Sequence, residues 1–374
     1  MRILHVNRNY LGTALHQTMM VHLDKLDVSN SVFVPVCKNV PAVISPNANV
    51  CVAACLNSVD RFFFSLKQFK ITRAIEKNFE VSKFDIIHAY TLFTDGNAAM
   101  KLAKKYHKPY VVAVRNTDVN VFFAKLIHLR HRGIEIMRNA KKIIFLSEAY
   151  RKIVFEKYVP QKYFEELFAK TEIIPNGISD FWFENTPENN NKTLDNPIKL
   201  IYAGVVNKNK NIPAVQKAME ILRNEGIDSV LTVIGKVEDE RELAIVKRDP
   251  STTYFPAMPK ESLIEQYRKN DIFVMPSFTE TFGLVYVEAM SQGLPVVYSR
   301  GQGFDGQFEE GFIGFHCNAF DANDIACSVK KVIAMYWQIQ SKCIKASLKF
   351  RWDEICDKYL KIYKSIVVAQ DVVE

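Results

Sequence analysis

The segment 276–288 reads PSFTETFGLVYVE and combines an expected helix start with two acidic side chains. We expect a buried strand to end at Met275 and a helix to begin near Gly283. Glycine lets a ligand approach the backbone closely. The first amides of such a helix carry a partial positive charge and bind a diphosphate without any side chain. The segment therefore predicts a phosphate site at the amides of Gly283, Leu284 and Val285.

Two carboxylates, Glu280 and Glu288, flank this predicted phosphate site. They suit hydrogen bonds from hydroxyl groups, and a helical rise of ~1.5 Å per residue places them on the order of 10 Å apart. That is roughly the span from a sugar ring, across a diphosphate, to a ribose. We predict that Glu280 holds a sugar and Glu288 a ribose diol. The spacing alone is not specific, because Glu148 and Glu156 repeat it.

The alternative interpretation is a strand–loop–helix unit with a surface glutamate at each end. What favours a binding site is the whole arrangement, in which strand, loop, Phe282–Gly283 and helix follow one another. We also expect the Thr281 hydroxyl to cap the helix by accepting one of its free amide protons.

The elements that must position this segment alternate between short apolar runs and longer amphipathic segments, which predicts parallel sheets covered on both faces. In the first half we expect strands at Ile3–Val6, Val32–Val36, Ile86–His88, Tyr110–Val114 and Lys142–Leu146, and helices at Ala14–Leu26, Leu66–Phe79, Asn97–Tyr106, Val119–Arg138 and Glu148–Tyr158. In the second half we expect strands at Ile198–Tyr202, Val230–Ile234, Thr253–Phe255, Ile272–Met275 and Pro295–Tyr298, and helices at Ile212–Asn224, Asp239–Lys247, Lys260–Lys269, Leu284–Gln292 and Ala322–Trp337.

A chain of 374 residues, 48% of them hydrophobic, exceeds the size of one core, so two α/β domains are expected. They join near 175–178, and the polar stretch 185–197 is predicted to be a surface loop. Ligands of parallel sheets bind beyond the carboxyl ends of the strands. The residues in those places are Asn7–Gly12, Arg115–Asp118, Gly204–Lys210, Gly235–Lys236 and Ser277–Gly283.

Charge and cysteine content narrow the class of protein. The net charge of +8 suits an anionic partner such as a nucleotide or a phospholipid surface, although most of these charges fit an ordinary solvated surface. The seven cysteines are scattered without metal-binding spacing, which favours free thiols in a reducing cytoplasm. We find neither a signal peptide nor an apolar run long enough to span a bilayer. We expect no nucleic-acid partner.

The second half resembles the retaining glycosyltransferases of family four, which have the GT-B fold. Their signature has the form Pro-Ser-x-x-Glu-x-Phe-Gly-x-x-x-x-Glu-Ala-Met-Ala-x-Gly-x-Pro-Val. The matching residues are Pro276, Ser277, Glu280, Phe282, Gly283, Glu288, Ala289, Met290, Gly293, Pro295 and Val296. The resemblance implies two Rossmann-like domains facing across a cleft. It implies an acceptor domain at 1–175 and a nucleotide-sugar donor domain at 176–351, with a C-terminal helix at about 352–374 packing back on the first domain.

In this family a Gly-Arg-x-x-x-x-Lys loop binds the donor diphosphate. Gly204 and Lys210 stand at the matching positions, and we assign Lys210 and Glu280 to catalysis as well as to donor binding. Val205 replaces the arginine, so one charge-assisted contact to phosphate is missing. Lys208, Lys236 and Arg300 are the candidates to replace it, and a solvated loop lysine is the alternative interpretation of Lys210.

The first half departs further from the family. A single glycine, Gly12, replaces a Gly-Gly loop and is predicted to approach the donor phosphate. Arg115 stands where many members have a histidine; it cannot transfer a proton at neutral pH but suits a developing phosphate charge or an anionic acceptor. Asp118 is the nearest carboxylate, with helix capping as its alternative role. We list Arg115 and Asp118 as candidate catalytic residues.

The resemblance also implies a metal-independent, retaining reaction without a cofactor. No Asp-x-Asp motif occurs in the chain. Helix amides and Lys210 would stabilise the leaving group. The leaving phosphate would help to deprotonate the acceptor, and Glu280 would orient the sugar rather than attack it.

The segment 60–77 carries four phenylalanines among arginines and lysines. A basic, aromatic helix of this kind suits an anionic membrane surface and an acceptor on a lipid carrier. The alternative is a helix packed on the sheet with one basic, solvated face.

We therefore predict a cytoplasmic enzyme, in part at the inner face of the plasma membrane. It moves a sugar from a nucleoside-diphosphate sugar to a saccharide or lipid-linked acceptor in cell-surface polysaccharide or glycolipid synthesis. The alternatives are a non-catalytic nucleotide-sugar-binding protein and a sugar-nucleotide epimerase of the same fold.

Overall fold

The computed structural model describes residues 1–38, 49–188 and 192–371, and the chain forms two compact units. Unit 1 comprises Met1–Leu146, Tyr150–Gly177 and Trp352–Glu374, and unit 2 comprises Ser147–Ala149 and Ile178–Arg351. The junction of the units at 177/178 lies close to the 175/176 boundary expected from the sequence. Within the described ranges, no helix has the length and apolar character needed to cross a membrane.

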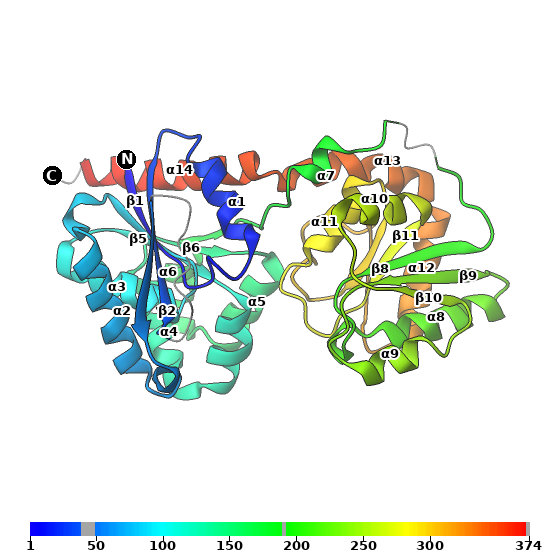
Figure 1. Ribbon diagram of the computed structural model, residues 1–374, viewed down its shortest axis with the longest axis horizontal. Helices are drawn as coiled ribbons and strands as arrows, with labels where there is room; N and C mark the ends of the chain where they lie inside the picture. Colours follow the sequence, from blue (N-terminus) through cyan, green and yellow to red (C-terminus); the bar gives the residue numbers. More distant parts are fainter. Residues whose placement is uncertain (39–48, 189–191, 372–374) are drawn as a thin grey trace. The chain divides into compact units, whose positions relative to one another are not determined.

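Unit 1 is built on a parallel sheet with the order β3-β2-β1-β4-β5-β6-β7 (Figure 1). Its strands are β1 (Arg2–Val6), β2 (Ser29–Cys37), β3 (Val50–Leu56), β4 (Ile86–Ala89), β5 (Tyr110–Val114), β6 (Lys142–Phe145) and β7 (Thr171–Ile173). The central strands β4 and β5 are buried throughout, which explains the continuous apolar sequence of β5 and, apart from His88, that of β4. The strands before β4 are added on one side of β1 and the later strands on the other, and sheets of this type bind ligands at such a switch point.

Helices cover both faces of this sheet (Figure 1). They are α1 (Ala14–Leu23), α2 (Phe64–Asn78), α3 (Thr94–Tyr106), α4 (Arg130–Asn139), α5 (Glu148–Lys157), α6 (Phe164–Phe168) and α14 (Trp352–Asp371). Shorter turns are η1 (Ser58–Phe62), η2 (Val81–Lys83), η3 (Asp118–Phe123), η4 (Ile127–Leu129) and η5 (Gln161–Tyr163). One core lies under α2 to α6, and a second lies under α1 and α14.

The C-terminal helix α14 belongs to unit 1, as the resemblance implied. Asp353 accepts a 2.6 Å hydrogen bond from the His22 ring of α1, and Tyr363 lies 2.7 Å from Nδ1 of the buried His88. Trp352 packs so closely on Gly177 that a Cβ there would lie 2.6 Å from its ring. Buried polar and aromatic contacts therefore fix α14 on the sheet.

Unit 2 repeats the architecture with the strand order β10-β9-β8-β11-β12-β13, all parallel (Figure 1). Its strands are β8 (Ile198–Ala203), β9 (Ser229–Ile234), β10 (Thr252–Phe255), β11 (Ile272–Met275), β12 (Val296–Ser299) and β13 (Gly314–Cys317). Its helices are α7 (Phe181–Glu184), α8 (Ile212–Asn224), α9 (Glu240–Val246), α10 (Lys260–Lys269), α11 (Leu284–Ser291), α12 (Ala322–Ala334) and α13 (Tyr336–Ser347), with turns η6 (Lys208–Lys210) and η7 (Leu348–Phe350). The neighbours β8 and β11 lie at the switch point, so the segments after them are expected to bind a ligand.

The predicted single helix at 119–138 is wrong. The structure has a π-helix at η3, a 3-10 turn at η4 and then α4. Arg130 explains the interruption, because its Nε donates to the Phe123 carbonyl at 2.6 Å. In a continuous α-helix that carbonyl would accept from residue 127.

Three strands were not predicted: β3, β7 and β13. All three are edge strands, and β7 and β13 are only three and four residues long. β7 and β13 are too short to leave a clear apolar pattern, whereas β3 is a continuous apolar run, VCVAACL, at the edge of its sheet. The predicted loop at 185–197 contains no helix or strand in its described part, and 189–191 lie outside the described residues.

Candidate functional site

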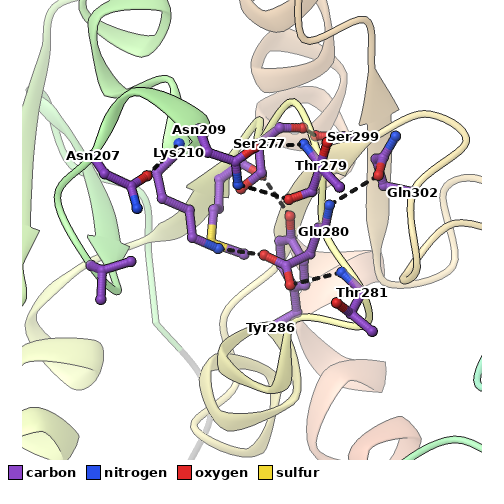
Figure 2. A network of polar contacts seen from close by, with 12 residues as sticks. Asn207, Asn209, Lys210, Ser277, Thr279, Glu280, Thr281, Tyr286, Ser299 and Gln302 are labelled. Atoms are coloured by element: carbon purple, nitrogen blue, oxygen red, sulfur yellow. Dashed lines mark hydrogen bonds and ion pairs between the residues drawn. The ribbon is translucent and has the colours of Figure 1, made fainter. Parts of the chain in front are cut away.

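The loop after β11 is fixed by hydrogen bonds before any ligand binds (Figure 2). Asn209 holds Thr279 through both backbone groups, accepting from its amide at 3.0 Å and donating to its carbonyl at 2.8 Å. The Glu280 amide donates to the Gln302 side chain at 2.9 Å, and the Glu280 carbonyl accepts from Gly303 at 2.8 Å. The loop is therefore held from the β8 side and from the β12 side at once.

Gly283 ends this loop and begins α11. Its φ of 78° lies in the left-handed region, and a Cβ would come within 2.5 Å of the Tyr286 ring. The expected cap from Thr281 is wrong, since α11 begins at Leu284 and its cap residue, Gly283, has no side-chain hydrogen bond. Among the residues that the structure describes, the amides of Gly283, Leu284 and Val285 have no acceptor. Three aligned donors are thus available to an anion, as predicted for a phosphate site.

Lys210 of η6 and Glu280 of the loop before α11 form an ion pair (Figure 2), and the Glu280 side chain lies next to Gly283. Lys210 Nζ lies 2.5 Å from Glu280 Oε2, and the two side chains are 15% and 13% exposed. The other carboxylate oxygen, Oε1, accepts from the Thr281 amide at 3.1 Å. Lys210 is placed by η6, whose cap residue, Asn207, accepts from the Lys210 amide. The sequence named both charged residues, but their direct pairing was not predicted.

Glu288, the second signature glutamate, lies on the next turns of α11. Burial raises the pKa of its carboxyl to about 7, while Lys260 and the nearby Trp182 indole act in the opposite direction. The indole nitrogen of Trp182 is near enough to lower this pKa, but it forms no hydrogen bond of good geometry within the described ranges. Glu288 is therefore a buried carboxyl whose charged form lacks strong partners, and donated hydroxyl hydrogens would stabilise that form.

The turn after β8, which begins at Gly204, is the other half of this site. Gly204 has a φ of 153°, and the Val205 carbonyl accepts from the Tyr202 hydroxyl at 2.7 Å. Of the three proposed replacements for the missing arginine, Arg300 already lies 3.3 Å from the Asp324 carboxylate. Lys208 and Lys236 are exposed and form no ion pair in the described part of the chain. They remain the candidates for an additional phosphate contact.

In unit 1, Arg115 and Asp118 both take part in a tight turn after β5. Asp118 is buried and accepts hydrogen bonds from the amides of Leu92 (2.9 Å), Phe93 (3.1 Å) and Arg115 (2.8 Å). Burial raises the pKa of Asp118 to about 6 despite these three donors. Asp118 therefore fixes the loop after β4 rather than capping its own helix, and its catalytic assignment stays a prediction.

The Arg115 guanidinium contacts protein groups of unit 1. Its Nε donates to the Tyr90 carbonyl at 3.3 Å, and one terminal nitrogen donates to Asn176 at 3.1 Å. These bonds leave further N–H groups for an anion. Gly12 lies in an exposed turn where an added Cβ would only touch the Asn9 carbonyl at 3.5 Å. Its backbone does not require glycine, so its donor role also stays a prediction.

A buried polar cluster in unit 1 escaped the sequence analysis. Both carboxylate oxygens of Asp95 and both amide atoms of Gln68 are shielded from solvent and lack hydrogen-bond partners in the part of the chain that the structure covers. Burial raises the pKa of Asp95 to about 7 and lowers that of the neighbouring Lys67 to about 8. The Arg8 amide and the Thr91 hydroxyl lie beside Asp95 without good hydrogen-bond geometry.

In the described ranges, one group of three side chains has the spacing to hold a metal ion. It consists of Asp305, Glu310 and His316, with His316 Nδ1 lying 3.1 Å from Asp305 and 3.2 Å from Glu310. The carboxylate of Glu310 also accepts from the Tyr298 hydroxyl and the His316 amide. Protein donors thus already satisfy this cluster, and it contains none of the predicted donor-binding residues.

Comparison with known families divides the chain at the same place as the fold. Residues 19–180 match the model described as Glycosyltransferase Family 4, and residues 184–350 match the model described as Glycosyl transferases group 1. A 41.2 kDa protein in the cps region of Klebsiella pneumoniae is 24% identical over 314 residues, covering 78% of this chain and 82% of that protein.

Two solved structures resemble both units together. Sucrose-phosphate synthase from Thermosynechococcus elongatus has a TM-score of 0.75 at 17% identity, covering 98% of this chain and 99% of that one. Anabaena Alr3699/HepE, in complex with UDP and glucose, has a TM-score of 0.68 at 16% identity, covering 98% and 100%. Together with the strand orders, these likenesses confirm the expected GT-B fold with two Rossmann-like domains.

Proposed function

Because the chain belongs to glycosyltransferase family four, we propose that it uses a nucleoside-diphosphate sugar and transfers the sugar to a hydroxyl of a saccharide or lipid-linked acceptor. The observation that carries this proposal is the Lys210–Glu280 ion pair beside the free amides of Gly283 and Leu284. A cation and aligned amide donors suit a diphosphate, and a carboxylate beside them suits sugar hydroxyls.

The reaction breaks the bond between the sugar and the diphosphate, whose oxygen keeps the electron pair. Lys210 and the α11 amides stabilise this developing charge in a site that is largely shielded from water. The acceptor oxygen bonds to the same carbon of the sugar, and its proton passes to the leaving phosphate. Retention of configuration is part of the proposal. So is independence from metal, because Lys210 and the α11 amides supply the charge stabilisation that a metal would otherwise give.

The two glutamates hold the ends of the donor in this proposal. Glu280 is oriented by Lys210 and the Thr281 amide, so its carboxylate is placed to accept from a sugar hydroxyl. Glu288 is buried with a pKa of about 7 and accepts from the ribose diol, which stabilises its charged form. Neither glutamate attacks the sugar.

We place the acceptor on unit 1. The bonds of Arg115 to Tyr90 and Asn176 leave N–H groups that suit an anionic group on the acceptor. The relative in the Klebsiella cps region supports cell-surface polysaccharide or glycolipid synthesis as the setting. Cytoplasmic donor sugars would place the enzyme in the cytoplasm.

A thermal-shift screen over nucleoside diphosphates tests the donor half directly. Selective binding to the native state raises the unfolding midpoint, by RT ln(1 + [L]/Kd) in free energy. UDP is the first nucleotide to test, because the Anabaena structure contains it. If no nucleoside diphosphate shifts the midpoint, the proposal fails.

Donor turnover without acceptor separates the remaining alternatives. A transferase is expected to release sugar and nucleoside diphosphate slowly, whereas a non-catalytic binding protein leaves the donor intact. An epimerase would release a sugar of changed configuration at a ring carbon, which NMR of the products would detect. Either of those last two results would overturn transfer.

A further inference from the structure

The segment formed by η1 and the first half of α2 exposes apolar side chains and buries polar ones. Five of its large apolar side chains are exposed to between 46% and 70%. They are Val59, Phe62, Phe63, Leu66 and Phe69. On the same helix Gln68 is fully buried and Lys67 is only 8% exposed. This reverses the usual orientation of an amphipathic surface helix.

The exposed side chains follow one stripe of the helix. Leu66, Phe69, Arg73 and Lys77 of α2 are all exposed, and their spacings of three and four residues place them on the same face. The stripe is apolar at its start and basic at its end. The sequence left open whether this face is only basic and solvated; the structure shows that its first half is aromatic.

A second segment of unit 1 extends the apolar surface. The ring of Phe64 lies 6.3 Å from that of Phe122, which places the start of α2 next to η3. Val121, beside Phe122 in the sequence, is 39% exposed, and Ile127 in the following turn is 64% exposed. The exposed Lys125 lies between them.

Clustered exposed apolar residues of this kind mark an interaction surface, whereas single exposed ones need no explanation. Elsewhere in the described chain, exposed large apolar residues such as Ile245 and Trp337 come one at a time in the sequence. The basic residues Arg73, Lys77 and Lys125 border the cluster and complement anionic headgroups. Phenylalanine and leucine on one face with lysine and arginine beside them suit a bilayer interface.

We propose that η1, the first half of α2 and the 121–127 turn bind the interface of an anionic membrane. Leu66 and Phe69 enter the boundary between headgroups and acyl chains, while Arg73 and Lys77 contact the headgroups. The contact is peripheral and brings unit 1 to an acceptor held on a lipid carrier. That last clause rests on the proposed transferase function, whereas the membrane contact does not.

Cosedimentation with vesicles of 70% phosphatidylcholine and 30% phosphatidylglycerol tests the surface. The full chain is expected to bind these vesicles, and Leu66→Gln/Phe69→Gln to lose binding by roughly ten-fold or more, given the apolar area that no longer enters the bilayer. Arg73→Glu/Lys77→Glu is expected to lose a similar factor on these vesicles, and to change little on pure phosphatidylcholine. Both pairs should keep the wild-type unfolding midpoint, since the altered side chains are exposed.

Ile245→Gln/Trp337→Gln is the matched control, because it removes two exposed apolar side chains from helices of unit 2. It is expected to bind vesicles like the wild type. Equal loss in the control and the α2 variant would overturn the proposal, as would a wild-type chain that ignores the vesicles. So would a wild-type dimer that Leu66→Gln/Phe69→Gln converts to monomer without vesicle binding, because a second copy would then cover the surface.

The nucleotide screen keeps this proposal distinguishable from the proposed function. Vesicle binding without any nucleotide-dependent shift would leave the membrane surface standing and remove the transferase. A nucleotide shift and donor turnover without vesicle binding would do the reverse.

Discussion

Lys210 with Glu280 in unit 2 and Lys67 with Asp95 in unit 1 are two lysine–carboxylate sets in opposite states. In unit 2 the charges lie 2.5 Å apart, both are partly exposed, and each carboxylate oxygen has a donor. In unit 1 Asp95 is fully buried, and neither residue has an ion pair in the described ranges. Burial moves the pKa of Lys67 down to about 8 and that of Asp95 up to about 7.

The difference shows that only the unit 2 pair has its carboxylate oxygens satisfied by the part of the protein that the structure describes. The unit 2 loop is fixed by Asn209 and Gln302, so the protein's own hydrogen bonds orient its polar groups. Such preorganisation suits the stabilisation of developing charge that the proposed transfer requires. In unit 1 the buried polar groups carry a free-energy cost that no described residue offsets. The unit 1 set is therefore expected to lower the stability of the fold.

Removing the cation of the complete site should have the largest effect. Lys210→Met removes the charge beside the phosphates and leaves Glu280 without its ion pair. We expect the transfer rate to fall on the order of 10²–10³-fold, as for the loss of a group that stabilises transition-state charge. Steady-state donor turnover measures this change.

Lys217→Met is the control for that measurement, because Lys217 is exposed on α8, the helix that follows η6, and is not a candidate phosphate contact. Its rate is expected to stay within about three-fold of wild type, in line with the small worth of an exposed charge. If both variants lost activity equally, the assignment of Lys210 would fail and the general positive charge of this part of unit 2 would matter instead.

Asp95→Asn tests whether the charged carboxylate of Asp95 in unit 1 lowers the free energy of unfolding. Because its pKa is raised on folding, from 3.8 to about 7, the charged form is disfavoured in the native state. The cost is absent below pH 4, grows as the pH rises towards 7, and is fully present above it. The variant should therefore exceed the wild type in unfolding free energy at pH 8, by about 2–3 kcal/mol. Denaturant unfolding at pH 8 and pH 5 should show the gap shrinking.

Asp118→Asn is the matched control in the same unit. Asp118 is equally buried and its pKa is also raised, but it accepts three backbone amides. Its replacement should therefore lower the unfolding free energy at pH 8. A stabilised Asp118→Asn, or a destabilised Asp95→Asn, would contradict the contrast between satisfied and unsatisfied carboxylates.

Glu288→Gln tests the buried carboxyl of unit 2, which is expected both to bind the donor and to lower the free energy of unfolding. We expect donor affinity to fall by about 1.5–3 kcal/mol, the worth of a hydrogen bond to a charged group. The free variant should nevertheless be more stable than wild type above pH 7, because the pKa of Glu288 is raised to about 7. Calorimetric titration with the nucleoside diphosphate and unfolding at pH 8 measure the two effects. Unchanged donor affinity would remove the ribose role.

The sequence predicted the strand, loop and helix start of the segment 272–284 because this information is local. A buried strand, a loop and Gly283 specify the turn that presents the α11 amides, and the φ of 78° explains why glycine is needed there. The predicted cap by Thr281 failed because the chain enters the helix through Gly283 instead. The domain pattern was accessible for a similar reason, since central strands such as β5 are continuous apolar runs.

The buried polar residues of unit 1 could not be predicted from the sequence in this way. Lys67 and Gln68 lie on an amphipathic helix, where polar residues are expected to face solvent. Only the tertiary structure shows that α2 turns these residues inward and Phe69 outward. Asp95 similarly has the type and position of an ordinary first-turn acid of α3. Which face of a helix is buried depends on contacts distant in sequence, and one sequence does not contain them in readable form.

The smallest expected effect comes from Gln68, whose two amide atoms are buried without hydrogen-bond partners among the described residues. Gln68→Met keeps the volume and shape of the side chain but removes its polar atoms. If bound water satisfied the amide, its loss would cost about 1 kcal/mol of unfolding free energy. If instead the amide is unsatisfied, the free energy of unfolding should stay equal or rise by about 1 kcal/mol. Denaturant unfolding measures the difference, and lower stability would show that the buried polar groups of unit 1 are satisfied and that the contrast between the two lysine–carboxylate sets does not hold.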